Sequence, residues 1–186
     1  MENLKEQTKK KISSDMETIS KYPHFSEIKC KMEEAQESIG YYFDEISLLM
    51  VAFCRTKIDN GKGKNNDTYV SDTLATLGDS VLHMLLVEYF FLKGKDKQEI
   101  NDCAEELEKN ETLTKIRERN KWTQYLYHEC YFYDTAPKHN QVSISASGHE
   151  PCIEAIIGAI YLDKGMDAAW EWIFKYIVEP SVSTDV

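Results

Sequence analysis

Apolar side chains recur every three to four positions over most of the chain, which predicts a succession of α-helices. The first clear helix covers residues 26–40, with Ser26 expected at its N-cap and Gly40 at its C-cap. The next helix is expected to begin at Asp44 and to end near Arg55. Because the spacing gives almost no strand signal, the pattern predicts an all-α fold.

The helical pattern resumes after a stretch rich in Gly, Asn, Asp and Lys. That stretch, residues 57–69, is the clearest predicted loop. A strongly apolar helix is expected from about Val70 to Lys93, and residues 97–122 predict one or two polar surface helices. The loop and the break at residue 94 therefore isolate one helix that is hydrophobic nearly all round, which is typical of the centre of a domain.

The C-terminal third is uneven in its pattern. Residues 125–149 combine aromatic and β-branched residues with a proline, so short helices and extended structure both remain open there. Pro151 suits the first position of an apolar helix that Gly165 would cap. A last amphipathic helix is expected at 167–178, ending before Pro180.

The length favours one compact domain. A chain of 186 residues can bury a core without disulfide or metal staples. We expect a charged N-terminal helix or tail at 1–25, a globular domain at 26–180 and a C-terminal tail at 181–186.

Composition narrows the class of protein further. The five cysteines are scattered, without a C-x-x-C pair or a histidine at zinc-ligand spacing, so neither a disulfide framework nor a zinc site is indicated. The N-terminus is polar and charged, and the longest apolar stretch is about half a membrane span. We therefore expect an intracellular protein that does not enter a membrane and that is cytoplasmic, with a nuclear location as an alternative in a eukaryote.

The chain is acidic, with a net charge of −10 from 32 acidic and 22 basic residues. Such a charge argues against nucleic-acid binding through general electrostatic attraction. If the protein binds RNA or DNA, a metal ion, a local basic strip or a partner domain must overcome this charge.

A glycine and a carboxylate stand together inside the most apolar predicted helix, at Gly78 and Asp79. Asp79 and His83 are one turn apart and share a helix face with Ala75 and Asp72. A carboxylate in such a helix needs a partner, because burying it bare costs several kcal/mol. Two interpretations remain: a pair with His83 or a solvated rim, and a functional carboxylate with Gly78 keeping the approach to it open.

Glu154 repeats this arrangement in the apolar helix that follows Pro151, with Gly158 one turn further on. A glutamate in a first turn commonly complements the helix dipole, and that remains the alternative. If Asp79 and Glu154 face each other, their oxygens would suit Mg²⁺ or Mn²⁺, the metals of phosphoryl chemistry.

Three segments together resemble a known family. They are "IGYYFDEISLLMVAFCRT", "LATLGDSVL" and "EAIIGAIYLDKG", and their order and spacing are similar to the landmark segments of the ribonuclease III domain over roughly residues 35–178. The resemblance implies an all-α helical bundle that forms a homodimer around double-stranded RNA. It also implies an endonuclease in which acidic side chains bind Mg²⁺, with Mn²⁺ as a substitute, and a water is activated to leave 5′-phosphate ends.

The resemblance assigns roles to individual residues. Asp79 takes the place of the signature aspartate and Glu154 that of the late glutamate, so both are expected to be catalytic metal ligands. Asp72 falls where the family commonly has a glutamate, and it is the third expected catalytic residue. Ala75 and Pro151 stand where further carboxylates are usual.

Loss of an acidic position from each helix leaves several explanations open. The protein could be a divergent nuclease that recruits Glu150, Asp72 or Glu99 instead. It could be a catalytically impaired member that serves as an RNA-binding or scaffold dimer. Ala75 could also be an engineered inactivating change, because alanine is the usual replacement. A helical interaction module without an RNA role is favoured only by the acidic charge.

Basic residues that could contact RNA phosphates cluster in the polar helices and beyond: Lys115, Arg117, Arg119, Lys121 and Lys138. Interspersed glutamates make a solvated helix face an equal alternative. Surplus apolar residues could supply a dimer interface or belong to the core: Tyr41, Tyr42, Phe43, Tyr69, Val70 and Leu74.

Overall fold

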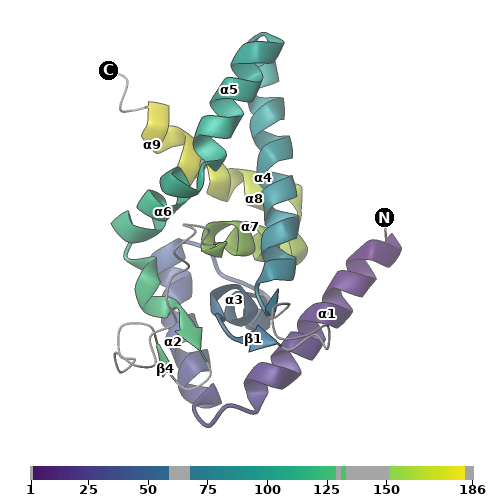
Figure 1. Ribbon diagram of the computed structural model, residues 1–186, viewed down its shortest axis with the longest axis vertical. Helices are drawn as coiled ribbons and strands as arrows, with labels where there is room; N and C mark the ends of the chain where they lie inside the picture. The colour runs from purple at the N-terminus through teal and green to yellow at the C-terminus, as the bar shows by residue number, and fades with distance from the viewer. Residues whose placement is uncertain (1, 59–67, 129–130, 133–150, 183–186) are drawn as a thin grey trace.

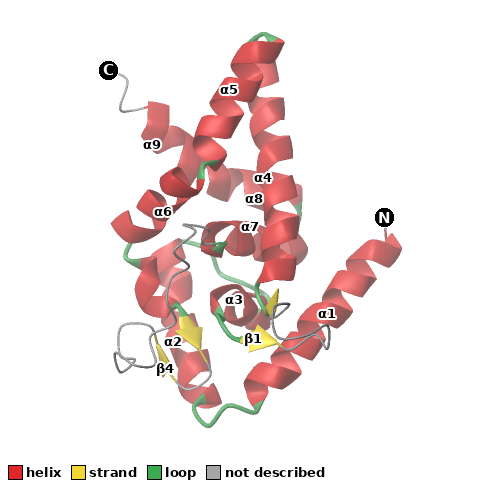
Figure 2. Cartoon of the chain, in the orientation of Figure 1, coloured by secondary structure: helices red, strands yellow, loops and turns green. Residues whose placement is uncertain are grey.

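The computed structural model describes residues 2–58, 68–128, 131–132 and 151–182. In these residues the chain is almost entirely helical, which confirms the all-α prediction (Figure 2). The helices are α1 (Glu2–Ser20), α2 (Phe25–Ile39), α3 (Ile46–Phe53), α4 (Asp72–Leu92), α5 (Lys97–Glu108), α6 (Asn110–Arg119), the 3₁₀ helix η1 (Trp122–Tyr125), α7 (Cys152–Lys164), α8 (Met166–Ile173), the π-helical η3 (Phe174–Val178) and α9 (Glu179–Val182).

Within the described residues, two antiparallel hairpins of two-residue strands accompany the helices. They are β1 (Lys57–Ile58) with β2 (Thr68–Tyr69), and β3 (Tyr127–His128) with β4 (Tyr131–Phe132). The sequence pattern predicted neither hairpin. Strands of this length carry too few residues to show an alternation, so periodicity could not reveal them.

The centre of the fold is the crossing of α4 and α7 (Figure 1). From this crossing α4 extends away together with α5, which returns alongside it. Helix α3 packs against α7, and α1 and α2 pack against α3, on the side of the molecule opposite the tip of the α4–α5 pair. Two apolar helices that cross in the middle of the core place any polar residue on them at a defined position.

The N-terminal segment is helical, and α1 is anchored by its apolar face. Ile12 is 5% exposed, and Ile19 is fully buried. Asp15 is also buried on this helix, where Lys11 donates a hydrogen bond to it. The sparse apolar stripe of residues 1–21 is therefore sufficient to dock the second half of a helix against the core.

The helix ends follow the sequence in part. Gly40 adopts the left-handed conformation (φ 65°) and donates to the carbonyls at the end of α2, as expected of a C-cap. The predicted N-caps are wrong: α2 already begins at Phe25, before Ser26, and Glu45 rather than Asp44 accepts from the backbone of α3. The backbone N–H of Asp44 instead donates to the Asp163 carboxylate of α7, at 3.1 Å.

The last helix does not stop before Pro180. A π-helical segment, η3, follows α8, and the chain continues through Pro180 in α9. Proline removes one backbone donor and crowds the preceding turn, and a wider π turn is one way in which a helix can accommodate this. The chain therefore remains helical beyond Pro180, the residue that was expected to end the helix.

Two tryptophans fix the end of α2. The indole N–H of Trp122 donates to the carbonyl of Ser38 at 3.3 Å, and that of Trp172 donates to the carbonyl of Ile39 at 2.9 Å. Their ring centroids lie 5.6 Å apart. Burying the apolar rings while pairing each N–H ties η1 and α8 to the same helix end.

Most of the residues that could have formed an interface belong to the core. Val70 and Leu74 are fully buried, and Phe43 is 9% exposed. Tyr42 remains 63% exposed. The side chain of Tyr69 lies outside the part of the chain that is described. Of the residues named, Tyr42 is therefore the one whose side chain is largely exposed and available to an interface within the described part of the chain.

Helix α4 is long and apolar enough to span a bilayer by composition alone, with a mean hydropathy of 1.3 over its best window. Within the fold, however, it packs against α7 and α5, and its exposed positions include Asp79, His83 and Glu88. These are the features of a core helix that contacts solvent along one edge.

Candidate active site

Helices α4 and α7 touch backbone to backbone. A Cβ atom placed on Gly78 would lie 1.7 Å from the carbonyl oxygen of Glu154, and one on Gly158 would lie 2.2 Å from the carbonyl oxygen of Leu74. Only glycine permits this approach at either position. Gly78 thus permits a close approach to the backbone of α4, and what approaches it is the backbone of α7.

This crossing brings the backbone of Glu154 against Gly78, the residue before Asp79. Asp79 is exposed, whereas Glu154 is 6% exposed and lies in the first turn of α7 among buried apolar residues. A buried carboxylate is stable only with partners that compensate its lost hydration. The pair thus consists of one carboxylate held in the interior and one at the surface.

Asp72 does not lie at the crossing. It is in the first turn of α4, two turns before Asp79, which corresponds to about 10 Å along the helix axis. An aspartate there complements the helix dipole. Arg55 organises the same helix end, because its guanidinium donates to the hydroxyl of Ser71 at 3.0 Å. The structure therefore separates Asp72 from the other two predicted catalytic residues.

The residues that replace the missing carboxylates are both buried. Ala75 is 6% exposed and belongs to the core, one turn before Asp79. Pro151 is the N-cap of α7, and its carbonyl accepts from Ala155 at 2.8 Å. In the described part of the chain, no group of three or more His, Cys, Asp or Glu side chains could hold a metal ion. The described residues thus supply two carboxylates at the crossing.

The carboxylates considered as replacements differ in position. Glu99 forms a capping box with Asp96 at the start of α5, with backbone-to-carboxylate distances of 2.9 and 3.0 Å. It precedes the C-terminal residue of α5, Glu108, by nine positions, or about 13 Å along the helix. Glu99 therefore serves the helix end and lies away from Asp79. Glu150 lies outside the described residues.

Sequence reasoning missed one acidic residue near Asp79. Glu108 lies against α4, and the Nδ1 atom of His83 is 2.9 and 3.2 Å from its two carboxylate oxygens. Burial raises the pKa of Glu108, the His83 partner lowers it, and the charges of Asp79 and Glu105 raise it further. In the sequence, Glu108 stands in the polar run "EELEKNE" and resembles an ordinary surface acid.

The predicted phosphate-contacting residues divide into three groups. Arg117 is 1% exposed, so it is not available on the surface and is removed from the predicted strip. Lys115, Arg119 and Lys121 are exposed, although Lys115 pairs with Glu111 at 2.7 Å. Lys138 lies outside the described residues. The basic strip on α6 is therefore shorter than the sequence suggested.

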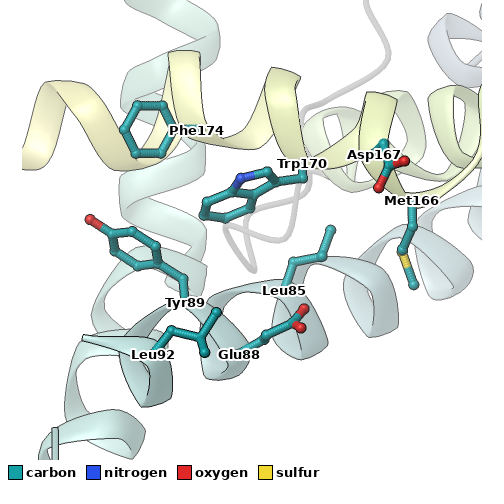
Figure 3. A pocket seen from close by; sticks show the side chains of 8 residues that line it. All are labelled: Leu85, Glu88, Tyr89, Leu92, Met166, Asp167, Trp170 and Phe174. Atoms are coloured by element: carbon teal, nitrogen blue, oxygen red, sulfur yellow. The ribbon is translucent and has the colours of Figure 1, made fainter. Parts of the chain in front are cut away.

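A separate groove of about 570 Å³ lies between α4 and α8 (Figure 3). Its lining is mainly apolar and aromatic, with two carboxylates: Leu85, Glu88, Tyr89, Leu92, Met166, Asp167, Trp170 and Phe174. The Trp170 ring lies 5.3 Å from that of Tyr89 and 5.6 Å from that of Phe174. None of the predicted catalytic residues lines this groove.

Known proteins are similar to this chain in sequence and in fold. The family model of the ribonuclease III domain matches residues 72–165, the segment that contains Asp79 and Glu154. The chain is 32% identical over 146 residues to ribonuclease 3 of Clostridium acetobutylicum, covering 77% of this chain and 60% of that protein. It is 30% identical over 165 residues to ribonuclease 3 of Clostridium tetani, covering 83% and 65%, respectively.

The fold resembles a solved nuclease domain. The nuclease domain of ribonuclease III from Campylobacter jejuni matches with a TM-score of 0.58 and 24% identity, covering 80% of this chain and 94% of that one. The present chain thus spans 60% and 65% of the two clostridial enzymes but nearly all of the solved nuclease domain. From the family match and the shared helical fold, we conclude that this chain belongs to the ribonuclease III family.

Proposed function

We propose that the protein is a divalent-metal-dependent endoribonuclease that cleaves double-stranded RNA. The observation that supports this proposal is the glycine crossing of α4 and α7, in which the backbone of Glu154 lies against Gly78, the residue before Asp79. Membership of the ribonuclease III family supports the reaction class. Selection of A-form RNA would rest on duplex shape and 2′-hydroxyl contacts rather than on sequence.

The two carboxylates fit the chemistry of a hard cation. Mg²⁺ is usually held by one or two carboxylates together with water and substrate phosphates, and Mn²⁺ accepts the same oxygen ligands. Asp79 and Glu154 would hold the ion in this proposal. When bound, such an ion lowers the pKa of the attacking water and stabilises charge on the phosphodiester.

The chain itself determines where the carboxylates lie. Asp79 is exposed on α4, where it can meet an RNA backbone. Glu154 is fixed from the interior, because its backbone is in contact with Gly78. Asp72, about 10 Å away along the helix, is placed to act on a flanking part of the substrate rather than at the same ion. The expected products carry 5′-phosphate ends.

A homodimer is part of this proposal, because a single site cannot cut both strands of a duplex in one encounter. Apolar side chains that the fold leaves exposed along α4 could be covered by a second copy: Met84 at 45%, Phe91 at 68% and Leu92 at 75%. The Campylobacter jejuni nuclease domain likewise has a region involved in dimer formation. Light scattering after size-exclusion chromatography should give a molar mass twice that of one chain. The double variant Met84→Glu, Leu92→Glu should give the mass of a single chain.

A catalytically impaired RNA-binding or scaffold dimer is the second candidate function. It is favoured by Ala75 and Pro151, because each replaces a usual acidic position with a residue that cannot bind metal. Two carboxylates also hold Mg²⁺ less firmly than a larger set. This candidate shares the fold and the RNA partner, and it differs only in chemistry.

A cleavage assay separates the two candidates. Long duplex RNA is incubated with the protein in Mg²⁺ or Mn²⁺, and the Asp79→Asn variant is compared under the same conditions. The nuclease proposal predicts cleavage that requires the metal and falls by roughly 100-fold or more in the variant. Duplex binding without cleavage in either metal would favour the scaffold.

A further inference from the structure

The pair of His83 and Glu108 joins α4 to α5 beside Asp79. Both carboxylate oxygens of Glu108 lie within hydrogen-bond distance of Nδ1 of His83, at 2.9 and 3.2 Å. The side chain of Glu108 is 20% exposed, whereas that of His83 is 60% exposed. The carboxylate is thus largely enclosed between the helices, and the imidazole projects from them.

This geometry fixes the chemistry of the imidazole. An ionised carboxylate only accepts hydrogen bonds, so Nδ1 of His83 must carry the proton and donate to Glu108. The second nitrogen, Nε2, is then left for another partner, and in the imidazolium form it is a donor. A carboxylate that fixes a histidine tautomer is a common device for orienting a functional imidazole.

The surroundings of the pair are acidic. The free energy needed to keep the Glu108 carboxylate ionised is therefore higher than it would be at an ordinary surface position. Burial is the largest cause that raises the pKa of Glu108, and the like charges of Asp79 and Glu105 raise it further. His83 is the ionic partner of Glu108 in the described part of the chain. A partly buried carboxylate among acids, held by one histidine, is the kind of strained electrostatic arrangement that functional sites carry.

We propose that His83 and Glu108 form a phosphate-binding pair, in which His83 donates from Nε2 to a backbone phosphate of duplex RNA next to Asp79. Glu108 is the positioning residue, because its carboxylate orients the ring through Nδ1. The inference rests on the duplex RNA substrate of the proposed function. It does not require that the protein cleaves RNA.

The pair also answers a difficulty raised by the net charge of −10. An RNA backbone that approaches Asp79 meets a carboxylate surface, and the exposed basic residues Lys115, Arg119 and Lys121 lie on α6 and the turn after it. A histidine one turn from Asp79 offers a phosphate a hydrogen-bonding group at the point of contact.

Binding of a fluorescent RNA duplex of roughly 20 base pairs, measured by anisotropy in EDTA, tests the inference without cleavage. His83→Ala should weaken binding by about fivefold, and the slope of log Kd against log salt should fall by about 0.9 because one phosphate contact is lost. The matched control is His24→Ala, since His24 is also exposed and pairs with a glutamate, Glu27, at 3.2 Å. The control should change neither quantity.

Glu108→Gln gives a test of opposite sign. A general electrostatic effect predicts that removal of an acidic charge tightens RNA binding. The proposed pair predicts weaker binding, because the imidazole loses the carboxylate that orients it. Glu105→Gln, an exposed neighbour on the same helix, should leave binding unchanged or tighten it. His83→Arg should restore the salt slope, because it returns a cation without needing the carboxylate.

Three results would overturn the inference: a salt slope unchanged in His83→Ala, a loss of affinity equal to that of the His24 control, or tighter binding by Glu108→Gln. Parallel cleavage assays in Mg²⁺ keep the two proposals apart. If the protein cleaves RNA but His83→Ala binds the duplex as tightly as the parent, the phosphate-binding pair is refuted and the nuclease proposal is supported. If binding depends on His83 but no cleavage occurs, the pair is supported and the nuclease proposal is refuted. A protein that does not bind the duplex contradicts both.

Discussion

Replacement of Gly78 by alanine tests whether the α4–α7 crossing determines the fold. The new Cβ would stand 1.7 Å from the Glu154 carbonyl oxygen and 2.7 Å from the Gly158 nitrogen, while ordinary contact begins at 3.4 Å. Both neighbours are backbone atoms, so no side-chain rotation can relieve the overlap. The two helices must separate.

The expected magnitude follows from two opposing effects. Alanine favours a helix interior by about 1 kcal/mol over glycine. Overpacking of a dense core costs about 1–3 kcal/mol and occasionally more, and a gap of even 0.5–1 Å forfeits roughly a quarter to a half of each contact it opens. Because the overlap is with backbone, we expect a net loss of about 3 kcal/mol, or a thermal midpoint lower by roughly 6–12 °C.

Urea denaturation followed by circular dichroism would measure this loss. Ser80→Ala is the matched control, because Ser80 is exposed on the same helix two residues later and should gain slightly from helix propensity. Gly158→Ala should resemble Gly78→Ala, since its Cβ would meet the Leu74 carbonyl oxygen at 2.2 Å. A Gly78→Ala protein as stable as the parent would refute the close crossing.

Three further predictions address other parts of the molecule. Burial raises the pKa of Cys54 to about 11, so at pH 8 an alkylating reagent should label exposed Cys30 long before Cys54, with equal labelling only in denaturant. Burial raises the pKa of Asp15 above its ordinary 3.8 despite Lys11, so its charge opposes folding at neutral pH and this cost disappears as pH falls through the folded pKa towards the unfolded one. Asp15→Asn should therefore raise the urea midpoint at pH 7 and lose that advantage near pH 3.8. Ala75→Glu should lower the Mg²⁺ concentration needed for cleavage and also lower stability, because Ala75 is 6% exposed and the new carboxylate must leave the core.

The sequence predicted the helices well where a residue type has a single physical use. Gly40 and Gly165 end their helices, and both have positive φ. Serine and aspartate are less decisive, because several polar residues near a helix start can accept the same backbone donor. Ser26 and Asp44 were therefore assigned as caps wrongly, and their roles depend on contacts such as that of Asp44 with Asp163.

The site was predictable to the extent that it lies in two helices. Gly78 and Gly158 marked unusual helix interiors, although their mutual contact is a tertiary fact that a one-dimensional pattern does not contain. Arg117 looked like a surface cation because it stands among charged neighbours, yet it is buried. Glu108 was missed for the converse reason: its proximity to His83 arises only when α5 folds back along α4.

A double-mutant cycle tests most directly the claim that Asp79 and Glu154 act as one metal-dependent site. Single-turnover cleavage of duplex RNA would be measured across Mg²⁺ concentrations for the parent, Asp79→Asn, Glu154→Gln and the double variant. If both residues serve one ion, each single change removes most of the rate, and the double variant is hardly slower than either. If the two single changes raised the activation free energy by amounts that add in the double variant, the residues would act independently, and the account would be contradicted. An Asp79→Asn protein that cleaves as fast as the parent would also contradict it.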